Sequence, residues 1–134
     1  MWMKLQRASL LLVFLSTLSL AANNASAQNQ TTPVKRLSSP AIVNGFIGGE
    51  SHDSYKIRVR KGKTLSVRIS WRREDDNNAE FTVSDSPDFG ESVEFGNESQ
   101  NGKRWRGKVP RTQNYYIYVV AHPSAHYTLR VTVN

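Results

Sequence analysis

The sequence predicts an all-β domain, a jelly-roll-like β-sandwich of about eight short, mostly antiparallel strands. From residue 41 onward, apolar and polar side chains alternate with a period of two in short runs. Turn residues separate these runs at regular intervals, and no segment has a convincing helical period. Regularly spaced short strands of this kind are typical of sandwiches and jelly rolls.

The alternating runs place the strands in order along the chain. The tightest link is Lys61-Gly62, between the second and third runs, because glycine adopts the positive φ that a two-residue hairpin turn needs. Asn101-Gly102 is a second signal of this type. Residues 28–40 are polar and contain two prolines, so we expect a flexible leader there and one folded domain over residues 41–134. We expect strands at residues 41–47, 54–60, 64–72, 80–84, 92–95, 104–109, 115–121 and 126–133.

The alternation also predicts the core, since a register slip of one residue would turn each apolar set to the other face. We expect both Trp71 and Trp105 to be buried. The inward set is Tyr55, Ile57, Val59, Leu65, Val67, Ile69, Trp71, Phe81, Val83, Trp105, Val109, Tyr115, Ile117, Val119, Tyr127, Leu129, Val131 and Val133.

The first 27 residues have the three parts of a signal peptide. Lys4 and Arg7 supply the positive start, residues 10–20 form a mostly apolar run, and Ala25-Ser26-Ala27 offers the small residues that a signal peptidase accepts. An uncleaved membrane anchor is the alternative, but the apolar run is shorter than the roughly 20 residues that cross a bilayer. We therefore expect cleavage after Ala27, a periplasmic or secreted protein, and no transmembrane segment after cleavage.

The composition and motifs of the chain limit which catalytic and metal sites it can form. The chain has no cysteine, which excludes thiol catalysis and zinc–thiolate sites. Small secreted eukaryotic domains usually rely on disulfides, so the absence of cysteine favours a bacterial source. No Gly-x-Ser-x-Gly elbow, Walker loop or HExxH motif is present. His122 and His126 are separated by a turn with a proline, which is not helical ligand spacing. We expect a non-enzymatic protein with no cofactor and no metal.

Acidic residues concentrate between positions 74 and 98, a stretch without lysine or arginine. Most of them are expected in loops, where nothing fixes the separation that an acid–base pair needs. Two oxygen-rich clusters suit calcium by residue type, but neither has the EF-hand spacing, and a solvated turn is the alternative. The clusters are Asp75 to Asn78, and Asp85 with Asp88 and Glu91.

The outward positions of the strands are strongly basic, in a chain of formal net charge +7. If these strands are neighbours, they form one basic face with aromatic rings. Such a face suits an anionic polymer, because protein cations release the counterions of the polymer. Charged outward positions also keep sheets soluble, and this alternative stays open. The candidate binding residues are Arg58, Arg60, Arg68, Arg104, Arg106, Lys108, Tyr116 and Tyr118.

Export argues against nucleic acid as the physiological ligand. The expected partner is an anionic envelope polymer, such as an acidic glycan or lipopolysaccharide, or else an acidic protein surface. The predicted function is therefore that of an exported binding module that recognises an envelope or extracellular polymer or protein.

Several stretches carry a family resemblance. They are residues 45–47 (GFI) with 53–55 (DSY), residues 61–67 (KGKTLSV), and residues 114–119 (NYYIYV) with 125–131 (AHYTLRV). In this order, over roughly residues 43–133, the chain resembles the bacterial pre-peptidase C-terminal domain and the related periplasmic inhibitors of g-type lysozyme. The resemblance implies a jelly-roll-like β-sandwich, and a module that binds rather than catalyses.

The inhibitor branch of this resemblance supplies an alternative function, inhibition of a g-type lysozyme. It implies that the loop at residues 110–114 enters the enzyme cleft, with Arg111 and Tyr115 as candidate contacts. The related inhibitors tend to carry a Ser-Gly pair before the tyrosine aligned with Tyr115, whereas this chain has Thr112-Gln113-Asn114. Because Gln113 places a long side chain where glycine leaves space, we expect weak or absent inhibition.

Overall fold

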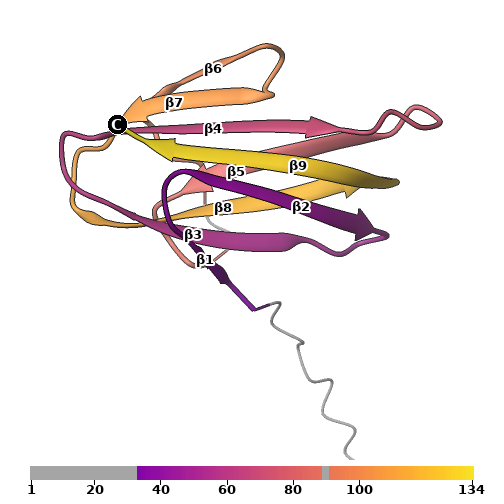
Figure 1. The fold of residues 1–134 in the computed structure, drawn as a ribbon, viewed down its shortest axis with the longest axis horizontal. Coiled ribbons are helices and arrows are strands. Elements are labelled where there is room, and N and C mark those ends of the chain that lie inside the picture. Colours follow the sequence, from indigo (N-terminus) through magenta and orange to yellow (C-terminus); the bar gives the residue numbers. More distant parts are fainter. Residues whose placement is uncertain (1–32, 89–90) are drawn as a thin grey trace, which may run out of the picture.

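Two β-sheets face each other in the computed structural model of the chain, which describes residues 33–88 and 91–134 (Figure 1). The predicted all-β sandwich is confirmed. The predicted signal peptide and its cleavage site lie outside the described residues. Within those two ranges, no helix is long and apolar enough to cross a bilayer.

The nine strands of the described ranges divide into sheets of four and five. The four-stranded sheet has the order β1-β3-β8-β5, and the five-stranded sheet has the order β2-β9-β4-β7-β6. Every pair is antiparallel except β1 with β3, which is parallel. The strands are β1 (Lys35–Leu37), β2 (Ala41–Gly48), β3 (Asp53–Val59), β4 (Thr64–Trp71), β5 (Asn78–Ser84), β6 (Asn97–Ser99), β7 (Arg104–Lys108), β8 (Gln113–His122) and β9 (Ser124–Val133).

Two elements differ from the sequence prediction. Strand β1 lies inside the segment predicted to be a flexible leader, where Leu37 packs against the core. The strand predicted at residues 92–95 is wrong, because this segment has an irregular backbone. Its apolar side chains still reach the core: Val93 and Phe95 pack against it, and the Val93 N–H donates to the Val83 carbonyl at 2.9 Å. A short strand, β6, follows instead.

The core between the sheets contains most of the predicted inward set. Trp105, for example, is 5% exposed and fully surrounded. Three members of that set, Trp71, Phe81 and Val133, are only partly buried. Trp71 lies at the end of β4. Its indole N–H donates to the Asn77 carbonyl at 3.3 Å, and the ammonium of Lys103 lies 4.9 Å from its ring centre. The expectation that Trp71 is a buried core residue was therefore wrong.

A buried chain of hydrogen bonds joins the two sheets. The Tyr127 hydroxyl, on β9, donates to the Asp53 carboxylate. Since a hydroxyl has a single proton to donate, the Tyr55 hydroxyl on β3 donates in turn to Tyr127. A Cβ at position 45 would lie 2.5 Å from the Tyr127 ring, so Gly45 leaves the space that the ring occupies. The residues that carry the family resemblance thus meet in a structural contact between the sheets.

Candidate functional site

The predicted basic residues lie on two opposite faces of the sandwich and not on one. Arg68, Arg104, Arg106 and Lys108 are exposed on the outer face of the five-stranded sheet. Arg58 and Tyr116 belong to the four-stranded sheet, and Arg60 follows β3 in the turn to β4. The alternation within a strand shows which way a side chain points but not which sheet the strand joins. The single basic face predicted from the sequence is therefore corrected to two.

Strand register aligns three arginines on the five-stranded sheet. Arg130 of β9 is directly opposite Arg68 of β4, and Arg68 is directly opposite Arg104 of β7. Neighbouring strands are about 4.8 Å apart, so these three residues, here called the arginine ladder, form a row of cations across the sheet. Arg106 and Lys108 continue the positive charge along β7. The arginine ladder with these two residues is called the basic face below.

None of the five cations of the basic face forms an ion pair within the described residues. The ion pair in this part of the chain is Arg72 with Glu74, at 2.9 Å, and it includes no residue of the basic face. Like charges directly opposite each other on neighbouring strands destabilise a sheet. The row thus lowers the stability of the free domain, and a bound anion would relieve that repulsion.

An apolar strip borders the basic face on the edge strand β2. Ile42, opposite Arg130, is 62% exposed, and Phe46 is 57% exposed. The Phe46 ring lies 4.6 Å from the ring of His126, centre to centre. Sequence reasoning missed this strip, although the outward positions of the run at residues 41–47 contain both side chains.

Tyr118 is not available for ligand stacking, which corrects its predicted place on an outward binding face. It points away from the core but is only 4% exposed, because residues 85–88 fold over it. Its hydroxyl is directed at the carbonyl oxygens of Ser86, Pro87 and Asp88. Tyr116 stays partly exposed, in register with Lys56 of β3.

The loop between β7 and β8 is anchored by the buried side chain of Tyr115. This side chain is 1% exposed, and its hydroxyl donates to the Arg111 carbonyl at 2.9 Å. A tyrosine near the start of a strand that bonds back to the chain upstream is similar to the tyrosine corner of other sandwiches. The Lys61 N–H also donates to the Thr112 hydroxyl at 2.9 Å. The loop is therefore ordered, with Tyr115 as its internal anchor and Arg111 exposed.

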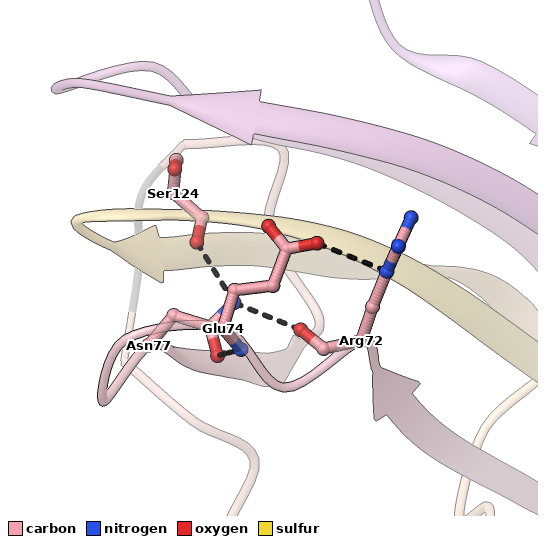
Figure 2. Close-up of polar contacts among 4 residues, drawn as sticks. All are labelled: Arg72, Glu74, Asn77 and Ser124. Atoms are coloured by element: carbon pink, nitrogen blue, oxygen red, sulfur yellow. Dashed lines mark hydrogen bonds and ion pairs between the residues drawn. The ribbon is translucent and has the colours of Figure 1, made fainter.

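The loop between β4 and β5 is organised by Asn77 (Figure 2). Its side-chain oxygen accepts from the Glu74 N–H at 2.9 Å, and its amide nitrogen donates to the carbonyls of Arg72 and Ser124 at 2.9 and 3.2 Å. Asn77 belongs to the oxygen-rich cluster at residues 75–78, and its side chain bonds the backbone of the loop and of Ser124 instead of pointing to a shared ion site. Across the described ranges, no three histidine, aspartate or glutamate side chains converge on one point.

Comparison with known proteins identifies the fold. No protein-family model matches the sequence, and a search of curated proteins finds no match. Among solved structures, Aeromonas hydrophila PliG, a periplasmic lysozyme inhibitor of g-type lysozyme, is 19% identical, with a TM-score of 0.61 over 77% of this chain and 97% of that one. Salmonella Typhimurium PliG, also a periplasmic lysozyme inhibitor of g-type lysozyme, is 19% identical, with a TM-score of 0.56 over 75% of this chain and 98% of that one.

A third similar structure is the pre-peptidase C-terminal domain of a collagenase from Bacillus anthracis. It is 18% identical, with a TM-score of 0.57 over 79% of this chain and 99% of that one. The predicted relation is thus confirmed at the level of structure. The described part of the chain has the β-sandwich fold of the periplasmic inhibitors of g-type lysozyme and of the pre-peptidase C-terminal domain.

Proposed function

We propose that this chain is an exported, non-enzymatic binding module that holds an anionic polymer on its basic face. The arginine ladder carries the proposal, because it gathers Arg130, Arg68 and Arg104 without an acidic partner in the described residues. A polymer that replaces its counterions with these cations gains free energy from counterion release. Export is supported by the signal-peptide pattern of residues 1–27.

An acidic glycan suits this surface better than a polyanion without sugar rings. A polymer that lies across the strands meets one arginine per strand, about every 4.8 Å, which is close to the length that one sugar ring adds to a chain. Hydroxyl groups flank the ladder on either side, from Ser66 and Ser70 of β4. The ring of Phe46 on β2, which lies tilted against the ring of His126 on β9, offers an apolar surface to the face of a sugar.

The first prediction concerns the basic face directly. The variant Arg68→Ser/Arg104→Ser/Arg106→Ser should bind alginate, a polyuronate, more weakly than the wild type. By analogy with nucleic acids, the slope of log affinity against log salt should fall by roughly 0.7 for each cation removed. Fluorescence anisotropy with labelled alginate at several salt concentrations measures both quantities.

A matched control removes the same number of cations from the opposite side. Lys56→Ser/Arg58→Ser/Arg60→Ser should leave alginate affinity close to that of the wild type, because these residues are not on the five-stranded sheet. Equal losses in both triple variants would show that only net charge matters, and that the basic face is no site. Because the ladder is self-repelling, its removal should not lower the unfolding midpoint.

Inhibition of a g-type lysozyme is the second candidate function, and the ordered β7–β8 loop favours it. A binding loop that is already ordered loses less conformational entropy when it enters a cleft. Here the loop is held by Tyr115 and Thr112, which leaves the Arg111 side chain free to meet a carboxylate in the cleft. Gln113 in place of a glycine still opposes close approach of the backbone.

We therefore expect weak or absent inhibition, and a turbidity assay of g-type lysozyme on bacterial cell walls tests this. Inhibition at a one-to-one ratio and submicromolar concentration, abolished by Arg111→Ala, would replace the polymer proposal with the inhibitor. Arg60→Ala is the matched control, since it removes an exposed arginine outside the β7–β8 loop.

A further inference from the structure

A second positively charged site lies where the chain crosses from β1 in one sheet to β2 in the other (Figure 1). A cavity of about 520 Å³ opens there, between β1, β3, the β3–β4 turn and the end of β9. The crossing segment is fixed in place, because the Val133 N–H donates to the Ser39 hydroxyl at 2.7 Å. None of the residues that line this cavity belongs to the basic face.

The charge in this cavity is positive only. It is lined by Arg36, Lys56, Arg58, Arg60 and Lys63, and by no aspartate or glutamate. None of these five side chains forms an ion pair with a carboxylate in the described ranges. A concave surface lined by one sign of charge concentrates the opposite ion.

The fold forces these cations together. The parallel register places Arg36 opposite Lys56, and Arg58 lies two residues further on the same side of β3, about 6.6 Å along the strand. The β3–β4 turn is closed by a bond from the Lys63 N–H to the Arg60 carbonyl at 3.1 Å. Like charges in such positions repel each other, so this cluster lowers the stability of the free domain.

The cavity also has neutral polar and apolar walls. Asn114, which is in register with Arg58, and the hydroxyls of Ser38 and Ser39 line it together with Leu37 and Val133. Small-molecule sites occupy roughly 300–1,000 Å³ and combine apolar walls with a few polar groups. The volume therefore has room for a group larger than a single inorganic ion.

We propose that this cavity binds a phosphate monoester about as large as a sugar phosphate. Arginine presents a planar fork of N–H donors that matches phosphate oxygens, and a phosphate monoester is mostly a dianion at pH 7. Arg36, Lys56 and Arg58 hold the phosphate group, and the remainder of the ligand lies against Leu37 and Val133. The site recognises a single charged group, in contrast to the extended row on the basic face.

Isothermal titration at constant ionic strength tests the site with three probes: inorganic phosphate, glucose 1-phosphate and glucose. We expect glucose 1-phosphate to bind at a one-to-one ratio and more tightly than inorganic phosphate, and glucose not to bind. Inorganic phosphate binding as tightly as glucose 1-phosphate would overturn the assignment of a phosphate monoester. The variant Lys56→Ser/Arg58→Ser should weaken glucose 1-phosphate binding at least tenfold.

The triple variant of the basic face is the matched control, and it should bind glucose 1-phosphate like the wild type. Equal weakening in both variants, or no saturable binding by the wild type, would overturn the proposal. Loss of fold is not a confounding outcome, because removal of mutually repelling cations should leave the unfolding midpoint unchanged or higher. Alginate and glucose 1-phosphate depend on different residues, so failure of one proposal leaves the other intact.

Discussion

Replacement of Trp105 by alanine should lower the free energy of unfolding by about 3–5 kcal/mol, the range for a buried tryptophan. The indole is 5% exposed and meets Phe95 edge to face, with ring centres 5.7 Å apart. Two glycines face its ring, and a Cβ at Gly107 would lie 2.8 Å from it. The ring therefore fills a slot shaped by backbone, which cannot collapse when the side chain is removed.

Urea denaturation followed by circular dichroism measures this loss. A small domain is stable by about 5–15 kcal/mol, so the midpoint should fall strongly. Trp71→Ala is the matched control, and its effect should be smaller because Trp71 is only partly buried. Equal effects of the two substitutions would contradict the burial of Trp105 between the sheets.

Gly107→Ala should also destabilise the domain, since the new methyl group collides with the indole of Trp105.

The domain should also lose stability steeply above pH 10. Burial raises the pKa of four tyrosines, Tyr55, Tyr115, Tyr118 and Tyr127, above the usual value. The folded state therefore keeps protons that the unfolded state releases above pH 10, so the free energy of unfolding falls as the pH rises. Each tyrosine that stays protonated in the folded state contributes a loss of about 1.4 kcal/mol per pH unit in this range. Below pH 10 this stability is fully present.

Tyr127 should contribute most of this alkaline sensitivity. Burial raises its pKa first, and the hydrogen bond that it donates to Asp53 raises it further, because loss of the Tyr127 proton would leave a phenolate against a carboxylate. Urea denaturation between pH 8 and pH 11.5 should give a shallower fall for Tyr127→Phe than for the wild type. Tyr116→Phe, which removes a hydroxyl from a partly exposed ring, is the matched control. An unchanged slope for Tyr127→Phe would contradict the buried hydrogen-bond chain.

Alternation of apolar and polar residues was enough to predict the fold class and most of the core. Leu65, Val67 and Ile69 are buried as expected, because the period of two leaves a strand no other register. The same pattern produced the error at residues 92–95, where Val93 and Phe95 alternate like strand residues but reach the core from an irregular backbone. Strand β1 was missed because its three residues, Lys35–Leu37, are too few to show an alternating pattern.

The candidate site was predictable only as a set of outward cations. The ladder of Arg130, Arg68 and Arg104 arises from the pairing of three strands, which the sequence of any one strand does not specify. Tyr118 shows a second limit, since a loop from elsewhere in the chain buries an outward-facing ring. Arg36 could not be placed at all from the sequence, because its neighbours are set by the crossing from one sheet to the other.

The strand order has a consequence for when the chain acquires its structure. The two strands that come last in the sequence, β8 and β9, each occupy an interior position of a sheet: β8 separates β3 from β5, and β9 separates β2 from β4. Until both have been synthesised, the earlier strands lack the neighbours that complete their ladders. A chain synthesised only as far as β7 therefore lacks the strands that join β3 to β5 and β2 to β4, so neither sheet can be completed before β8 and β9 are present.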